Sequence, residues 1–193
     1  MNTAAPTTRP SFSPLGLADR SVIWQVAAVA LGTLFLALSS YVEVPMVPVP
    51  MTMQTFAVVM VGALYGWRLG AVTIVAWLIE GAIGLPVLSG GAAGAIHFVG
   101  PTAGYLFAFP IAGAIAGWLA EQGWNGNKPV LAFLAAIAGN LACLTLGGAW
   151  LAAMIGAEQA FIHGVAPFLV GAVLKSVLGA AALAGLQRMA SKR

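Results

Sequence analysis

The sequence is poor in charged residues and has a single cysteine, and each shortage excludes a class of protein. Only 7% of its 193 residues are charged, whereas a soluble domain carries about 25%. Hydrophobic residues make up 61% of the chain, so too few polar side chains are present to cover a surface in water. The single cysteine, Cys143, excludes a disulfide within the chain, and its apolar neighbours favour a small buried thiol.

Several functional motifs are also missing. No second metal ligand stands at helical spacing from His97, so this histidine is better interpreted as a loop or lid residue. The glycine-rich stretch 84–105 lacks the Lys-Ser/Thr ending of a phosphate-binding P-loop, so the chain is not expected to hydrolyse ATP. The basic residues form no groove with interleaved aromatics, which argues against nucleic-acid binding. We therefore expect a protein that is not an enzyme and holds no metal or cofactor.

Long apolar runs dominate the rest of the sequence. A helix needs about 20 apolar residues to cross the hydrocarbon core of a bilayer, and several such runs follow one another with short breaks. The predicted spans are residues 21–40, 52–66, 68–83, 102–121, 129–150 and 165–187. They predict an all-α integral membrane protein, a six-transmembrane-helix bundle over residues 21–190. Residues 1–20 are predicted to form a disordered cytoplasmic tail, because the first 18 are rich in Pro, Ser and Thr.

The basic residues predict the orientation of this bundle. Seven of the eight precede the first span, follow the last one, or lie in the loops between spans two and three and between spans four and five. The loops at the opposite face, 41–51, 84–101 and 151–164, contain no Lys or Arg. By the positive-inside rule both termini are cytoplasmic, and the predicted location is multi-pass in the cell (cytoplasmic) membrane. The eighth basic residue, Lys175, has no place in this pattern.

Lys175 is predicted to lie deep in the membrane. It follows Val165 by ten residues, which at 1.5 Å per residue places it about 15 Å below the outer surface. A lysine at that depth costs about 2.5–3.5 kcal/mol. No Asp or Glu lies mid-span, and Glu80 near the outer end of span three is the nearest candidate partner. An ion pair with a carboxylate such as Glu80, or a neutral desolvated amine, are two structural explanations. We favour a third, in which a small anionic ligand brings the opposite charge from outside.

Two outer segments contain further candidate residues for such a site. Loop 41–51 holds three prolines that favour an extended chain, which serves either as a lid or as a stiff connector. Thr52 and Gln54 at its inner end are expected to face the same half of the bundle as Lys175. Tyr105, near the start of span four, supplies an aromatic face and a hydroxyl group.

Two other features favour packing over ligand binding. Asn140, a polar residue within span five, is best explained by an interhelical hydrogen bond. Ala28 and Gly32 form a small-residue face on span one that suits close packing. This face could meet another span or a separate membrane protein.

Four stretches of the chain, in this order, resemble the BioY family. They are VPMVPVPMTMQTF (44–56), GLPVLSGG (84–91), GPTAGYLFAFPIAG (100–113) and PFLVGAVLK (167–175). Members of this family are the biotin-binding S components of energy-coupling-factor transporters. The likeness covers about residues 25–180 with a matching six-span topology, and the VPVPxTxQT and GPTxGYL motifs are specific.

The resemblance implies a site for biotin that opens to the outer side and is closed by the loop between spans one and two. Lys175 would pair with the valerate carboxylate of biotin. Tyr105 and Phe168 would form walls around its bicyclic ring system. Thr52 or Gln54 would contact its ureido group or order the lid.

The chain departs from the family pattern at three positions. In the family motif Pro-Phe-x-Pro-Gly-Asp-x-x-Lys, Val170 replaces the second proline and Ala172 replaces the aspartate, whereas Lys175 is retained. Gly90 stands where some relatives place a polar side chain that contacts the ligand, and we include it among the predicted site residues.

The resemblance also implies partners, namely a transmembrane coupling subunit and a pair of ATPase subunits, docked on the small-residue face of span one. Three alternatives stay open. The chain could be a solitary biotin transporter, or an S component for another small anionic vitamin, which the loss of the aspartate at Ala172 would favour. It could also be an intramembrane enzyme or chromophore protein that uses Lys175 covalently, although the mid-membrane carboxylate that this chemistry needs is missing.

Overall fold

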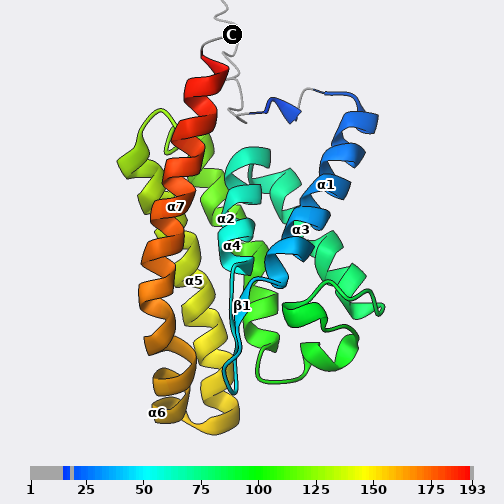
Figure 1. Cartoon of the computed structure of the whole chain (residues 1–193), viewed down its shortest axis with the longest axis vertical. Coiled ribbons are helices and arrows are strands. Elements are labelled where there is room, and N and C mark those ends of the chain that lie inside the picture. Colours follow the sequence, from blue (N-terminus) through cyan, green and yellow to red (C-terminus); the bar gives the residue numbers. More distant parts are fainter. Residues whose placement is uncertain (1–14, 18–19, 192–193) are drawn as a thin grey trace, which may run out of the picture.

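The structure, a computed structural model, describes residues 15–17 and 20–191 and is built mainly of helices (Figure 1). The long helices are α1 (Val22–Ser40), α2 (Gln54–Tyr65), α3 (Trp67–Ala82), α4 (Ala103–Glu121), α5 (Pro129–Ile155) and α7 (Ala166–Ala190). The short elements are β1 (Glu43–Val44), β2 (Met51–Thr52), η2 (Ser89–Gly91), η3 (Ala95–Phe98), α6 (Ala157–Ala160) and η4 (Phe161–Val165). Most of the predicted tail, residues 1–20, lies outside the described residues.

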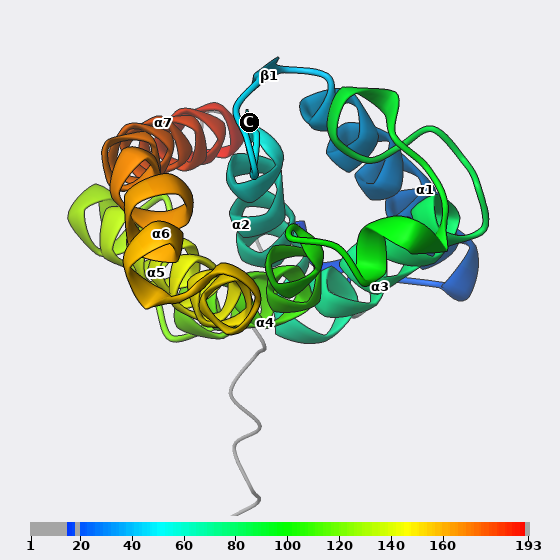
Figure 2. The same ribbon diagram turned by 90° about the horizontal axis from the view of Figure 1, so that it is seen from below.

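Four of the described helical segments are long and apolar enough to cross a membrane. They are α1, α4, α5 and the continuous segment Ala157–Ala190, which contains α6, η4 and α7. The start of α1 and the end of α7 lie at one end of the molecule, here named the terminal end (Figure 1). The β1–β2 hairpin and α6 lie toward the opposite end, here named the loop end (Figures 1 and 2). An all-helical protein with several membrane-spanning helices is thus confirmed, whereas six spans and cytoplasmic termini stay predictions.

The segment predicted as the last outer loop, 151–164, is helical instead. Helix α5 continues to Ile155, and Gly156 ends it with a φ of 87°, a backbone conformation that favours glycine. Helix α6 and the π-helical turn η4 follow at once and lead into α7. Pro167 lies in the first turn of α7, where its missing N–H costs no hydrogen bond. The prediction was wrong because it followed the drop in apolar character, whereas a helix at a membrane surface tolerates polar residues.

Helix α2 is short, as predicted, and lies in the middle of the bundle. It packs against α1, α3, α4, α5 and α7, and Figure 2 shows it among them. All residues from 57 to 63 are buried. A helix enclosed by protein does not have to span the lipid by itself, because its neighbours do so. The chain before α2 is the extended segment that the prolines predicted, with β1 antiparallel to β2 and Glu43 opposite Thr52.

Near the terminal end the helices approach one another through glycine. A Cβ atom added at Gly62 of α2 would lie 2.1 Å from the carbonyl oxygen of Gly113 on α4. One added at Gly117 would lie 2.7 Å from the carbonyl oxygen of Gly62. The backbones of α2 and α4 are therefore in direct contact here, which side chains would prevent. Nearby, Oε1 of Glu121 accepts a hydrogen bond from the backbone N–H of Trp67 at 3.1 Å and places a carboxylate at the start of α3.

The small-residue face of α1 is covered from inside the bundle. Ala28 is 7% exposed, and its carbonyl oxygen accepts a hydrogen bond from the Tyr65 hydroxyl at 2.9 Å. A Cβ atom at Gly32 would lie 2.5 Å from Cγ2 of Thr73 on α3. This face thus packs against α2 and α3, which is one of the two contacts predicted for it, and the docking of a partner subunit stays a prediction. The outward side of α1 exposes large apolar side chains such as Trp24, as a lipid-facing helix does.

Candidate ligand-binding site

A cavity of about 270 Å³ lies at the loop end of the bundle. Its walls come from α2, α4, α5 and α7, and the hairpin and the α3–α4 loop contribute residues such as Val49 and Leu88. Ligand pockets usually measure about 300–1,000 Å³, so this one suits a small molecule. Most of its lining is apolar, with a few polar groups that can fix the orientation of a ligand.

Five of the six predicted site residues line this single cavity. They are Thr52, Gln54, Tyr105, Phe168 and Lys175, contributed by β2, α2, α4 and α7.

Gly90 is not among the lining residues. It adopts a φ of 61° in η2, and a Cβ atom there would lie 2.7 Å from Oε1 of Glu43. A side chain at this position would therefore compete for space with the Glu43 carboxylate. The adjacent Ser89 lines the cavity in its place.

Lys175 is held by two neutral oxygen atoms. Its Nζ donates a hydrogen bond to the backbone oxygen of Thr52 at 2.5 Å and another to the Thr55 hydroxyl at 3.1 Å. An ammonium group has three N–H donors, so one is left for a ligand. Glu80, the carboxylate partner considered from the sequence, is not among the lining residues. The carboxylate that does line the cavity belongs to Glu43, and it accepts a hydrogen bond from the Ser89 hydroxyl.

Gln54 and Thr52 form a buried network that fixes the inner end of the hairpin. The Thr52 hydroxyl donates to Oε1 of Gln54 at 2.9 Å and accepts from the Gln54 backbone N–H at 3.2 Å. Nε2 of Gln54 donates to the Ser40 hydroxyl at the end of α1 at 3.0 Å. These bonds orient the Thr52 carbonyl toward Lys175. Of the two roles predicted for this pair, the contacts support ordering of the lid.

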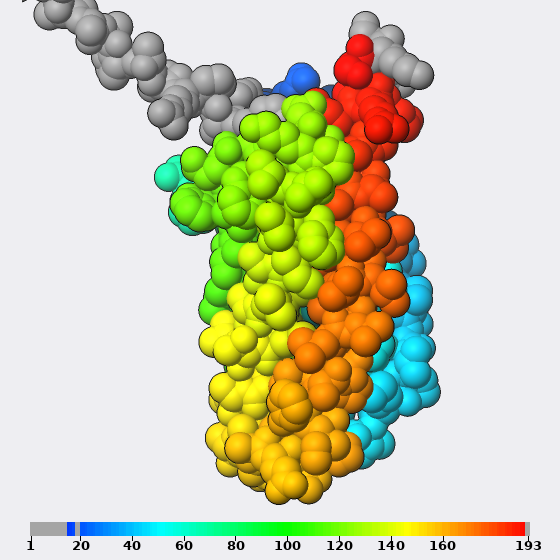
Figure 3. Space-filling model, turned by 90° about the vertical axis from the view of Figure 1, so that its left-hand side faces the viewer, coloured from blue at the N-terminus to red at the C-terminus, as the bar shows by residue number. Residues whose placement is uncertain are grey.

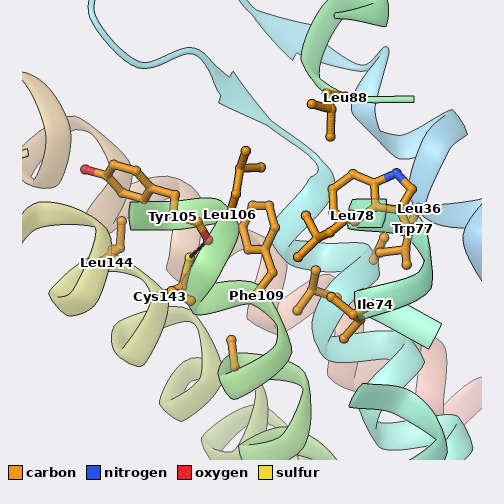
Figure 4. Close-up of a cluster of buried hydrophobic side chains, with 14 of the residues drawn as sticks. Leu36, Ile74, Trp77, Leu78, Leu88, Tyr105, Leu106, Phe109, Cys143 and Leu144 are labelled. Carbon is orange, nitrogen blue, oxygen red and sulfur yellow. Dashed lines mark hydrogen bonds between the residues drawn. The ribbon is translucent and has the colours of Figure 1, made fainter. Parts of the chain in front are cut away.

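Aromatic and aliphatic side chains form the apolar walls. The rings of Tyr105 and Phe168 stack with centroids 6.4 Å apart and an interplanar angle of 27°. The Tyr105 hydroxyl donates to the backbone oxygen of Gly164 at 2.7 Å, which ties α4 to the turn before α7. Figure 4 shows Tyr105 beside Leu106 of α4 and above Cys143 of α5. Cys143 is fully buried, as the sequence predicted.

Two hydrogen bonds join the hairpin region to the α3–α4 loop. The Tyr41 hydroxyl donates to the backbone oxygen of Pro86 at 2.6 Å, and the Ser89 hydroxyl donates to the Glu43 carboxylate. Val49 of the hairpin is buried and lines the cavity. The proline-rich segment therefore covers a cavity and is more than a connector.

Among the lining residues that were not assigned to the site from the sequence are three polar ones, Thr55, Ser89 and Asn140. Thr55 lies within the VPVPxTxQT motif, which could have identified it. Ser89 is adjacent to the predicted Gly90. Asn140 was assigned to helix packing alone.

Comparison with known proteins relates the chain to membrane transporters. The sequence model of the BioY family matches residues 9–192. A probable biotin transporter BioY from Pyrococcus horikoshii is 39% identical over 151 residues, which cover 77% of this chain and 88% of that protein. The biotin transporter BioY of Rhizobium etli is 38% identical over 142 residues, 69% of this chain and 75% of that protein.

One solved structure also matches. It is the crystal structure of the S-component for biotin from an ECF-type ABC transporter, with a TM-score of 0.73 and 25% sequence identity. The match covers 86% of this chain and 92% of that chain. The matching family and these relatives are transporters, not enzymes.

Proposed function

The chain belongs to the BioY family, and we propose that it captures biotin as the substrate-binding S component of an energy-coupling-factor transporter. It is a multi-pass membrane protein, and we place it in the cell membrane with both termini in the cytoplasm and the loop end facing outward. Biotin then reaches the cavity beneath the hairpin from the outer side.

One observation supports this function above the others: an ammonium group with a spare N–H donor lines an apolar, aromatic-walled cavity. Lys175 keeps one donor free after binding Thr52 and Thr55. Biotin combines a carboxylate, an apolar bicyclic ring system and a ureido group. Lys175 pairs with the carboxylate, and Tyr105 and Phe168 enclose the ring system.

The remaining predicted residues hold the hairpin and the neighbouring loop in place over the cavity. Thr52 and Gln54 hold the inner end of the hairpin in place through the network described above. Gly90 leaves room for the Glu43 carboxylate at the edge of the cavity.

Energy for release into the cell comes from other subunits in this proposal, because the sequence contains no P-loop. A transmembrane coupling subunit and a pair of ATPase subunits supply it. They dock elsewhere than on Ala28 and Gly32, which are covered by α2 and α3. Uptake of labelled biotin by cells with and without these subunits separates a dependent S component from a solitary transporter.

The second candidate is transport of another small anionic vitamin, which the methyl group of Ala172 in the cavity lining favours. Competition of lipoate and pantothenate against labelled biotin decides between the two. Displacement by one of them at lower concentration than unlabelled biotin would favour the second candidate.

The proposed role of Lys175 is tested by equilibrium binding of biotin and of its neutral methyl ester to purified protein. Wild type should bind the ester roughly 10- to 100-fold more weakly, because the ester has no negative charge to pair with the ammonium group. Lys175→Met should bind both ligands equally weakly. Lys128→Met, which removes an exposed cation outside the cavity, is the matched control and should bind like wild type. Tight binding of biotin to Lys175→Met would contradict the role.

A further inference from the structure

Asn140 does more than join two helices. Its Nδ2 donates to the backbone oxygen of Ala136 at 3.0 Å and to the hydroxyl of Ser176 on α7 at 3.1 Å. The interhelical bond predicted from the sequence is therefore confirmed, between two helices that lie side by side over much of their length (Figure 3). Both N–H groups of the amide are used by these contacts, whereas its oxygen takes part in neither.

The contacts also fix which way the amide points. The Ala136 carbonyl can only accept a hydrogen bond, so the atom facing it must be the NH₂ group. The Ser176 hydroxyl donates its hydrogen to the backbone oxygen of Ala172 at 2.7 Å, so its oxygen can accept a hydrogen bond from Asn140. Oδ1 of Asn140 is thereby directed away from both partners.

The unpartnered oxygen opens into the ligand cavity. Asn140 is 2% exposed and lines that cavity. Among the described residues, every side-chain nitrogen or oxygen atom without accessible surface has a hydrogen-bond partner. Oδ1 of Asn140 takes part in neither of the two bonds of the amide, so it must have some accessible surface. For a side chain this buried, that surface faces the cavity. A buried acceptor in an apolar cavity is costly unless a ligand supplies a donor.

Oδ1 of Asn140 lies near Ala172 of α7, whose side chain has no polar group. Ser176 connects Asn140 to the carbonyl of Ala172, whose side chain lines the same cavity with only a methyl group. The amine of Lys175 instead reaches Thr52 and Thr55 at the start of α2. The donor and the acceptor therefore lie on different walls and can hold different polar groups of one ligand.

We propose that Oδ1 of Asn140 accepts a hydrogen bond from an N–H group of the bound ligand and so sets its specificity. This proposal rests on the proposed function, in which the ligand is biotin and the N–H groups belong to its ureido ring. A site with a buried acceptor rejects an analogue that lacks the matching donor, because the acceptor is then left unpaired. Asn140 thus selects a cyclic urea over a carboxylate ligand without such a donor.

The test compares equilibrium binding of biotin with that of two biotin derivatives, each methylated on one ureido nitrogen. Wild type should bind one derivative roughly 10-fold or more weakly than biotin, because its N–H donor is gone. Asn140→Leu, and Asn140→Ala as a second apolar replacement, should bind biotin and that derivative with similar affinity.

Ser176→Ala is the matched control, because it removes the interhelical hydrogen bond and leaves Oδ1 in the cavity. It should discriminate between the ligands as wild type does. The proposal is overturned if wild type binds both derivatives like biotin, if both apolar variants keep the discrimination, or if Ser176→Ala loses it equally. Failure of wild type to bind biotin at all would overturn the proposed function as well, which separates the two failures.

Discussion

The two ends of α2 and α4 differ in the size of the residues where these helices face each other. Toward the terminal end, Gly62 and Gly113 bring the two backbones into contact. Toward the loop end, Gln54 and Tyr105 on the same two helices line a cavity. Residue size along one pair of helices thus decides where the bundle is closed and where it is open.

This difference shows how a small membrane protein can hold a cavity and still be stable. The hydrophobic effect does not drive helices together in lipid, so close backbone contact and interhelical hydrogen bonds must hold the bundle. The glycine contacts supply this at the terminal end. The loop end can then keep a polar network and an ammonium group beside open space.

The largest effect is expected when the closed end is forced apart. Gly62→Val would place side-chain carbons where a Cβ atom alone lies 2.1 Å from the Gly113 oxygen. Overpacking of a core typically costs about 1–3 kcal/mol, and contact with backbone puts this variant at the upper limit or above it. We expect little monodisperse protein and a lower Tm in detergent.

Gly185→Val is the matched control, because a Cβ atom at Gly185 of α7 would meet nothing within 4 Å. It should behave like wild type. Equal stability of the two variants would contradict the difference between the two ends, because it would mean that the glycine contacts do not close the terminal end.

A smaller effect is expected when the cover of the open end is loosened. The Ser89 hydroxyl donates a hydrogen bond to the Glu43 carboxylate, and both residues line the cavity. Loss of such a bond is worth about 1 kcal/mol. Glu43→Ala and Ser89→Ala should each speed dissociation of labelled biotin roughly five-fold. The double variant should be no faster than either single variant, because one interaction is removed in all three. Additive effects would show that the two residues act separately.

The sequence was sufficient to place most helices. Apolar runs predicted α1 and α4 within a residue or two, because lipid requires long apolar helices. The connection from α5 to α7 was missed, since Glu158 and His163 resemble loop residues when judged by polarity alone. The helical path there depends on Gly156 and on packing against α5, and neither can be recognised from the polarity of the sequence.

The site was predicted only where a motif or a chemical anomaly marked it. Lys175 stood out because a cation in an apolar run needs an explanation. Its bonds to Thr52 and Thr55 could not be predicted, because they join residues more than a hundred positions apart. The interhelical bond of Asn140 was predicted correctly, but the direction of its oxygen depends on the positions of Ala136 and Ser176 in space.

The account depends most on the claim that biotin occupies the cavity at the loop end, and the single cysteine allows a direct test. Cys143 lines the cavity and has no exposed surface. Its modification by methyl methanethiosulfonate is followed by intact mass, with and without biotin. The control is a variant that carries Cys143→Ser and Ala120→Cys. Ala120 is equally buried in α4 near the terminal end and does not line the cavity.

Biotin at about ten times its Kd should slow modification of Cys143 roughly 10-fold, because the bound fraction of the protein is protected. The cysteine at position 120 should be slowed far less. Bound biotin that leaves the rate at Cys143 unchanged, or that slows both positions equally, would contradict the claim.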